Sequence, residues 1–251
     1  MFLIHTWLQE EKSCNHLSRP KKKYIGENMK FENTEVWGFE HTFRGMRNPK
    51  ESWNKSDSEW ETHIDYNKYE VYTKFVIGKN DLKLAQSLIK AGPEHRKFLR
   101  QIFVAVDITA PLYWWKEFDT YKVGTVANST STMHKLASTP ITKDCFEMDD
   151  FEPFYVANYT PYTNITDIWK KEIEVLEGLR IAYNETKDKR YWKELIRLLP
   201  ESWLQTRTVT MNYENILNMI RQRKNHKLTE WSKLFIDWAF SLPYAKEFFN
   251  S

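Results

Sequence analysis

The sequence predicts an α+β domain that holds more helix than sheet. Short runs rich in β-branched and aromatic residues, at 69–77, 98–108 and 206–211, are typical of strands. Apolar residues recur at helical spacing in the segments between and after these runs. Gly and Pro are scarce, at 7 and 9 of 251 residues, which argues against a disordered or loop-dominated chain.

The first half of the chain changes from irregular to periodic sequence. Residues 31–60 are mixed, with a turn at Asn48-Pro49 and an exposed loop at 55–58. After the strand at 69–77, Asn80-Asp81 offers an N-cap to a helix that Gly92-Pro93 ends. This helix is indicated by an apolar stripe of four residues, Leu82, Ala85, Leu88 and Ile89.

The second half is expected to be mainly helical. Ala110-Pro111 interrupts the strand at 98–108, and a helix is expected over 112–122, followed by a loop region at 140–161. The apolar stripe over 166–184 marks the clearest helix, and a second helix spans 188–198, before Leu199-Pro200. The strand at 206–211 enters a helix at Asn212, and a last helix runs over 228–240.

The first 28 residues differ from the rest of the chain. They lack periodicity and carry a basic run at 19–23, so we expect a disordered tail followed by one domain over 29–251. Gly26-Glu27-Asn28-Met29 can be encoded by GGA-GAA-AAT-ATG, which resembles a bacterial ribosome-binding site before a start codon. The native start is therefore either Met1 or Met29. An arm that binds nucleic acid or a partner is the functional alternative.

Charge, cysteine content and hydropathy restrict the class of protein. The net charge of +3 is small for this length and gives no general case for a nucleic-acid binder. The two cysteines, Cys14 and Cys145, fit neither a zinc site nor a disulfide framework, which favours a reducing compartment. No apolar run approaches the ~18 residues that span a bilayer. We therefore expect a cytoplasmic protein without membrane contact.

Several common kinds of site are absent from the sequence. There is no glycine-rich phosphate loop, no pair of histidines at helical metal spacing and no nucleophile elbow. Cys145 lies among acids, which is an unfavourable setting for a nucleophilic thiolate. We expect no metal site.

Two segments carry candidate binding chemistry. Residues 112–134 combine Trp114 and Trp115, which could stack on a flat ligand, with a cluster of hydroxyl and amide side chains. Residues 206–231 place cations beside asparagines, and the amides at the start of the helix at Asn212 could face an anion. A capped turn and a solvated basic face are the plain alternatives. The cations are Arg207, Arg221, Arg223, Lys224, His226 and Lys227.

Taken in order along the chain, these segments resemble the flavin-dependent thymidylate synthases. Upstream, the segment 81–95 resembles the helix and Glu-His segment ahead of that family's flavin pocket, and residues 110–113 resemble the entry into its signature helix. The likeness thus spans about residues 69–243. The resemblance implies helices packed on a mostly antiparallel sheet, with active sites between the subunits of a homotetramer. The C-terminal matches are Leu199-Pro200, Thr206-Arg207, Asn212, Asn218, Arg223, His226 and Glu230.

The resemblance also implies an activity, cofactors and site residues. The family makes thymidylate from deoxyuridylate, with FAD as hydride carrier, methylenetetrahydrofolate as carbon donor and NADPH as reductant. By resemblance, Lys122, Tyr121 and Arg207 would act in catalysis. The expected substrate contacts are Ser131, His134, Glu117 and Arg207, and the expected flavin contacts are Asn128, Asn212, Asn218, Arg221, Arg223 and His226.

The signature motif departs from the family's pattern. Where the family has R-H-R, this chain has Thr120-Tyr121-Lys122, so only Lys122 keeps a positive charge. Asn128 and Ser131 match the family's N-x-x-S if one residue is inserted, whereas the final R-Y becomes Met133-His134. The Gln before the motif becomes Glu117, which adds a negative charge near an anionic substrate. The lost guanidiniums would otherwise polarise the pyrimidine.

Three functions stay open on the sequence alone. The first, which we favour, is a flavoenzyme that acts on a deoxyuridylate-like pyrimidine nucleotide. The second is a non-catalytic protein that binds a nucleotide or nucleic acid on the same fold. The third is a structural or partner-binding protein without a site. The expected partners are a small nucleotide and further copies of the chain, with nucleic acid less favoured.

Overall fold

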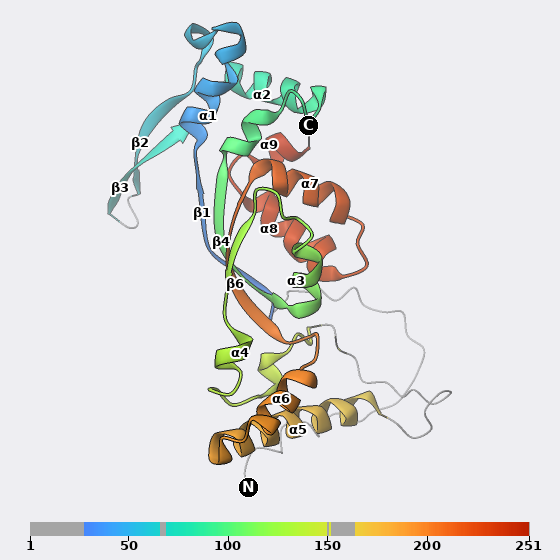
Figure 1. Ribbon diagram of the computed structural model, residues 1–251. Helices are drawn as coiled ribbons and strands as arrows, with labels where there is room; N and C mark the ends of the chain where they lie inside the picture. Colours follow the sequence, from blue (N-terminus) through green and yellow to red (C-terminus); the bar gives the residue numbers. More distant parts are fainter. Residues whose placement is uncertain (1–27, 66–68, 150, 152–163, 251) are drawn as a thin grey trace, which may run out of the picture.

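A four-stranded antiparallel sheet runs through the centre of the molecule (Figure 1). The computed structural model describes residues 28–65, 69–149, 151 and 164–250, and within them the strands lie in the order β1-β4-β6-β5. Each strand is antiparallel to its neighbours. The predicted arrangement of helices on a mostly antiparallel sheet is therefore confirmed. The strands are β1 (Lys30–Trp37), β4 (Phe103–Pro111), β5 (Val126–Ser129) and β6 (Leu204–Asn212).

The sheet has one face buried by helices and one open face. Successive side chains of a strand point to opposite faces, and in β4 buried residues alternate with partly covered ones. An antiparallel sheet tolerates an open face where that face can contact water. In Figure 1 the covering helices lie together on one side of the sheet. They are α3 (Leu112–Phe118), α7 (Tyr213–Arg223), α8 (Ile236–Ser241) and α9 (Ala245–Phe249).

Large aromatic rings fill the main hydrophobic core between the sheet and these helices. Trp114, Trp115, Trp231 and Tyr213 are almost completely inaccessible to solvent. Trp231 belongs to a π-helical turn, Glu230–Phe235, that leads directly into α8. Each such ring removes on the order of 150–250 Å² from water, so the aromatic content of the sequence is mainly a property of the core.

Two helices and a hairpin form one end of the molecule (Figure 1). α1 (Phe39–Met46) follows β1, and α2 (Lys79–Ala91) leads toward β4. Between them, β2 (Glu59–Asp65) and β3 (Glu70–Val76) pair as a separate two-stranded hairpin that projects from the body. Short 3-10 turns complete this end: η1 (Asn48–Lys50), η2 (Trp53–Lys55) and η3 (Lys97–Gln101).

A second, smaller core lies at the opposite end of the molecule. Here α5 (Ile165–Thr186) and α6 (Lys189–Arg197) pack against the segment that follows β5. That segment contains two short turns, α4 (Thr132–Lys135) and η4 (Lys143–Cys145). The buried residues of this cluster are Leu136, Ile141, Phe146, Leu176 and Leu195.

Most of the predicted elements are confirmed, with small shifts at their ends. The predicted strands at 69–77 and 206–211 are β3 and β6, and the helices at 166–184 and 188–198 are α5 and α6. Asn212 is the N-cap of α7, as its position before an apolar stripe indicated.

Four boundaries were predicted wrongly. The first part of the strand at 98–108 is η3, because Phe98 and Leu99 both turn into the core instead of alternating. The helix expected over 112–122 ends at Phe118, the N-cap of α2 is Gly78, and the last helix begins as a π-helical turn. Residues 31–60, whose sequence shows no single periodicity, hold most of β1, all of α1 and the start of β2.

Predictions for the tail before residue 28, including the choice of Met1 or Met29 as the start, concern residues outside the described part. Most of the loop expected at 140–161 also lies outside it, since residues 150 and 152–163 are not described. Among the described residues, no helix combines the length and the apolar character that crossing a bilayer requires.

Candidate functional site

The C-terminal ends of α3 and α7 meet above β6. Because β4 and β6 are antiparallel, α3 and α7 start at opposite ends of the sheet and run toward each other. Their ends bring together side chains that lie about a hundred residues apart in the sequence. We call this group the α3–α7 cluster; it consists of Glu117, Asp119, Tyr121, Arg207, Arg223 and His226. The predicted juxtaposition of the two candidate segments is therefore present within one chain.

Buried indole rings form the floor of the α3–α7 cluster. Trp114 stacks on Trp231 with 4.4 Å between ring centroids, and Trp115 lies nearly perpendicular to Trp114 at 4.9 Å. Trp114 and Trp115 are 0% and 1% exposed. The prediction that these two rings stack on a flat ligand is therefore wrong, because both rings are used to fill the core.

Arg223 is held by three groups at the end of α7. Its Nη1 lies 2.5 Å from a carboxylate oxygen of Glu117, and its Nε donates to the Tyr121 hydroxyl at 2.8 Å. The guanidinium also sits over the Trp231 ring, 5.0 Å from the centroid. His226 Nε2 approaches the same Glu117 oxygen at 3.3 Å. Glu117 therefore faces two cationic candidates at once.

Arg207 is held in a similar way on the buried face of the sheet. Its register partner is Ile108, and its guanidinium lies 4.2 Å from the centroid of the Trp115 ring. Nη1 donates to Asp119 at 2.7 Å, and Nε donates to the side chain of Gln205 at 3.0 Å. Only 16% of the Arg207 side chain is exposed. The position is preorganised, since stacking and two hydrogen bonds fix one rotamer.

The α3–α7 cluster is close to electrically neutral. The sequence analysis noted few acids near the C-terminal cations, but the fold supplies Glu117 and Asp119 from α3 and the turn after it. Charge-assisted pairs of this kind satisfy the arginines. An anionic ligand that binds here must therefore displace a carboxylate or add its charge beside one.

The start of α7 does not present free amides to an anion, contrary to the prediction. Asn212 and Asn215 form a capping box in which each side chain accepts from the other's backbone N–H, and the Tyr213 N–H donates to the Ile102 carbonyl. Glu214 in the first turn already supplies the negative charge that a helix start favours. Asn212 is thus a capping residue in this chain.

A second ion pair links α7 to the segment before η3. Arg96 and Glu214 are both buried and lie 2.9 Å apart, and Arg96 Nη2 donates to the Asn218 side chain at 3.1 Å. Burial, together with the positive charge of Arg96, lowers the pKa of Arg221 from its usual value. Asn218 and Arg221 therefore belong to this Arg96 pair and are separate from the α3–α7 cluster.

A wide groove lies between α1, α2 and η3, and its lining includes His95 and Lys97, the chain neighbours of Arg96. Its volume is about 1360 Å³, which is large enough for a cofactor, and His95 lies at its edge beside Arg96. Within the described part of the chain, no ion pair is formed by Lys50, Lys55 or Lys83, which line this groove. Only the segment 81–95 of this groove had a counterpart in the sequence-based resemblance, because most of the other lining residues come from α1, η1, η2 and η3 and share no motif.

Comparison with solved structures identifies the fold. The chain superposes on thymidylate synthase X (ThyX) from Helicobacter pylori, crystallised with FAD and dUMP, with a TM-score of 0.59 and 15% sequence identity. The alignment covers 88% of this chain and 96% of that one. A second structure described as a flavin-dependent thymidylate synthase ThyX from the same organism, also with FAD and dUMP, gives 0.59 and 16%, with coverage of 88% and 97%. No family model and no curated protein matches the sequence.

The chain has the fold of a flavin-dependent thymidylate synthase. On this ThyX fold, the remaining predicted residues lie apart from the α3–α7 cluster. Asn128 pairs with Thr208 on the open face of the sheet, and Lys122 is exposed in the turn after α3. Ser131 caps α4 by accepting from the backbone of His134, whose side chain is exposed. One chain therefore does not gather all the predicted site residues in one place.

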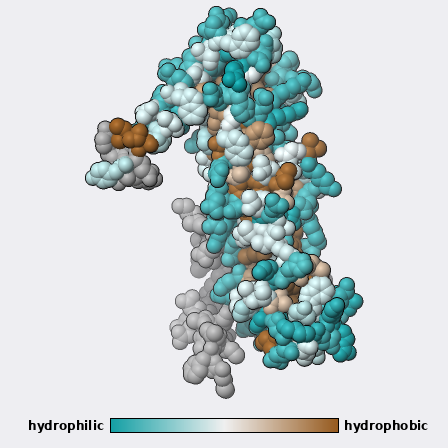
Figure 2. All heavy atoms as spheres, turned by 60° about the vertical axis from the view of Figure 1, so that its left-hand side comes forward, coloured by the Kyte–Doolittle hydropathy of each residue, from teal (hydrophilic) through white to brown (hydrophobic). Residues whose placement is uncertain are grey.

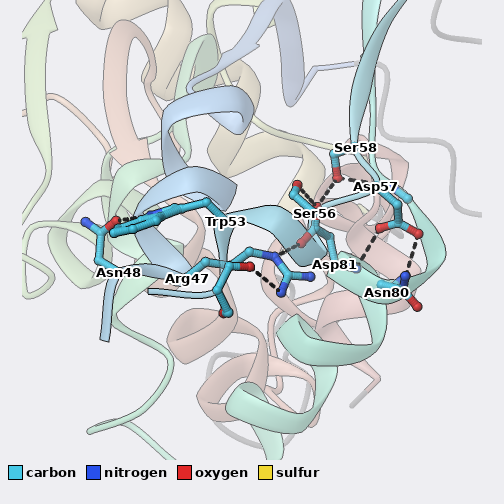
Figure 3. A network of polar contacts seen from close by, with 10 residues as sticks. Arg47, Asn48, Trp53, Ser56, Asp57, Ser58, Asn80 and Asp81 are labelled. Atoms are coloured by element: carbon cyan, nitrogen blue, oxygen red, sulfur yellow. Dashed lines mark hydrogen bonds and ion pairs between the residues drawn. The ribbon is translucent and has the colours of Figure 1, made fainter. Parts of the chain in front are cut away.

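A buried acidic centre supports the wall of the groove (Figure 3). Asp81 is fully buried and accepts from Arg47 and from the hydroxyls of Ser56 and Ser58, each at 2.6 Å. Asp57 in turn accepts from the amides of Asn80 and Asp81 and so caps the start of α2. These contacts fix the loop 47–58, which carries two of the groove lysines, onto the ThyX-like body.

Glu230 and the acids near it have structural partners. The Tyr113 hydroxyl donates to both Glu147 and Glu230, and burial followed by these carboxylates raises the pKa of Tyr113 well above its usual value. Among the residues that the structure describes, no group of three His, Cys, Asp or Glu side chains is arranged to hold a metal ion.

Proposed function

We propose that this chain is a flavoprotein that binds FAD and a pyrimidine deoxynucleotide, and that it transfers a one-carbon unit to deoxyuridylate or a close analogue. The observation that carries the proposal is the meeting of α3, α7 and β6 on a ThyX fold, with two preorganised arginines at that place. The ThyX structures of this fold were crystallised with FAD and dUMP. NADPH and methylenetetrahydrofolate are the co-substrates that the same resemblance implies.

The groove between α1, α2 and η3 fits the dinucleotide part of FAD. It offers lysine ammoniums for a pyrophosphate, and it ends at His95, beside the Arg96 contact with Asn218. Asn218 and Arg221, which are predicted flavin contacts, do not line the groove, so they would contact the cofactor only where it extends beyond the groove past Arg96. When bound, FAD supplies hydride transfer, and the protein supplies binding and orientation.

The α3–α7 cluster is the proposed place of the nucleotide. Arg207 would hold the phosphate, and Tyr121 with Arg223 would face the base, with Lys122 adding charge from the exposed turn. Glu117 and Asp119 already neutralise both arginines, so the free energy of binding an anionic nucleotide here is less favourable than at an unpaired guanidinium. The exposed His134 and Asn128 and the partly buried Ser131 would join the site only from another copy, which agrees with a homo-oligomer. A homotetramer in the cytoplasm remains part of the proposal.

The test is a spectroscopic titration of the purified protein with FAD. We expect oxidised-flavin absorption to co-purify, or to appear with altered shape when FAD is added. Lys83→Gln in the groove should weaken FAD binding roughly two- to fivefold, the effect of an exposed charge contact of up to ~1 kcal/mol. Lys90→Gln, on the same helix α2 but outside the groove, should leave it unchanged. A protein that binds no FAD contradicts the proposal.

The neutralised arginines favour one alternative, a nucleotide-binding protein that has lost the flavin. Calorimetry with deoxyuridylate in the absence of FAD separates the two functions. Clear binding of the nucleotide by a protein that never binds FAD supports the alternative. Dependence of nucleotide binding on FAD supports the flavoenzyme.

A further inference from the structure

The hairpin formed by β2 and β3 has one apolar face that is left exposed among the residues the structure describes. Paired residues of two strands share a face, so the register defines this surface. Trp60 pairs with Phe75, and Ile64 pairs with Val71. Phe75, at the base, packs on the main core, but Trp60, Ile64 and Val71 are 57%, 54% and 69% exposed. Thr62 and Thr73 form the middle pair of this face. The opposite face is more polar: it carries Glu59, Glu61, His63 and Lys74, together with Tyr72.

The hairpin stands clear of the body. In Figure 2, which brings this side of the molecule forward, it projects away from the main mass with apolar surface near its end. An isolated two-stranded hairpin is at best marginally stable in water, so its outer half lacks the packing that would normally hold it. The base is fixed by Phe75 and by the Ile77 N–H, which donates to the Tyr244 hydroxyl at 3.0 Å.

A second surface, which no described helix covers, lies on the same side of the molecule, opposite to α7 and α8 (Figure 1). It belongs to the open face of the sheet, and we define it by alternate residues of β4, β6 and β5. On the same face, the edge strand β1 adds the exposed Lys30, Glu32 and Glu35. Across these three strands the open face carries one charged residue, Asp107, and that carboxylate is already hydrogen-bonded to Asn33 and Thr208. The other residues are Phe103, Ala105, Thr109, Thr206, Thr208, Thr210, Val126 and Asn128.

The size of the hairpin's apolar face decides what can cover it. A large aromatic side chain offers up to about 250 Å², so Trp60, Ile64 and Val71 together expose roughly 300 Å². A single contact with another molecule would remove about twice that, roughly 600 Å², which is well below the ~1,200 Å² of a stable specific interface. Two reciprocal contacts between the same two molecules would together bury about 1,200 Å², the area of a stable specific interface.

We propose that the hairpin is an arm that docks on the open sheet face of a second copy of this chain. A second copy brings the same arm and the same open face, so a two-fold axis forms two identical arm-to-sheet contacts at once. The part of the open face formed by β4, β6 and β5 has Asp107 as its one charged residue, and that carboxylate is already hydrogen-bonded, so it can accept the apolar face of the arm without burying an unpaired charge. The charged residues of β1 lie beside this part, at the edge of the sheet. The inference shares with the proposed function only the association of copies of the chain, and of the residues proposed for the nucleotide site only Asn128 lies on the docking surface.

Sedimentation equilibrium of the full chain tests the proposal. The triple variant Trp60→Ser, Ile64→Thr, Val71→Thr should raise the dissociation constant of the self-associated form at least tenfold. The matched control, Glu61→Gln, His63→Thr, Lys74→Gln, changes the other face of the same strands and should leave the dissociation constant unchanged. A wild-type chain that stays monomeric at high concentration overturns the proposal, as does a triple variant that associates like the wild type.

The triple variant could also lose self-association because its hairpin unfolds, and a crosslinking experiment separates this case from loss of the contact. In a background with Cys14 and Cys145 replaced by Ser, Val71→Cys and Thr208→Cys chains are mixed and oxidised. We expect a disulfide between the two different chains, and none when Glu61→Cys replaces Val71→Cys. Equal crosslinking from both faces of the hairpin, or from neither, contradicts the arm-to-sheet contact.

Discussion

At the scale of single residues, Asp81 is the charged group on which the groove wall most depends. Burial alone would raise the pKa of Asp81, but hydrogen bonds from Ser56, Ser58 and Arg47 outweigh burial and lower it. A carboxyl with a lowered folded-state pKa stabilises the fold above its unfolded pKa, and this stability is lost as the pH falls toward the folded value. Protonation of Asp81 at acid pH should therefore weaken the hydrogen bonds that hold the loop 47–58 in place.

We expect Asp81→Asn to lower the free energy of unfolding at neutral pH by about 3–5 kcal/mol, because Arg47 is then left buried without a counter-charge. The variant should also lose part of the wild type's decline in stability at acid pH. Chemical denaturation at several pH values measures both effects. Glu201→Gln, which removes the exposed pair with Lys116, should cost under about 1 kcal/mol. Equal losses in the two variants would show that Asp81 is not effectively buried.

At the scale of elements, the sequence was most informative where one periodicity dominated. The stripe over 166–184 predicted α5 because a long amphipathic helix leaves a repeated signal, and TRTVTM predicted β6 through alternation. β5 was missed because VANS is polar and fully exposed, and only pairing with β6 makes it a strand. The pairing of Glu117 with Arg223 was not visible either, since tertiary contacts over such a sequence distance follow no local pattern.

The turn after α3 contains one glycine, Gly124, that packs closely against the capping residues Asn212 and Asn215 of α7. Gly124 has φ +79°, and a Cβ there would lie 2.9 Å from Asn215 Oδ1 and 3.0 Å from Asn212 Nδ2. We expect Gly124→Ala to lower the free energy of unfolding by about 1–3 kcal/mol through backbone strain and loss of the cap. Gly178→Ala in the middle of α5 meets nothing within 4 Å and should instead stabilise by about 0.5–1 kcal/mol. Thermal or urea unfolding measures whether each variant is destabilised or stabilised. A Gly124→Ala variant as stable as the wild type would contradict the proposed role of the turn.

At the scale of the whole molecule, the two separate hydrophobic cores divide the chain into regions of different stability. The main core packs against the buried face of the sheet and underlies both the groove and the α3–α7 cluster. The small core packs α5 and α6 against the segment 136–148. The small core joins the rest through a few contacts, such as the bridge between Phe146 and Trp203 and the bonds of Tyr113. Regions with few buried apolar contacts open first.

This division predicts different outcomes for two matched substitutions in fully buried leucines. Leu176→Ala in α5 should cost about 2–5 kcal/mol, enough to open the small core locally, so amides of α5 and α6 should exchange hydrogen much faster while those of β4 and β6 keep their protection. Leu217→Ala in α7 has a similar cost but lies in the main core, so it should raise exchange across α7 and the sheet together. Hydrogen exchange resolved by peptide measures both variants. Uniform loss of protection in Leu176→Ala would mean that the two cores unfold as one unit, and that α5 and α6 hold the site's strands in place.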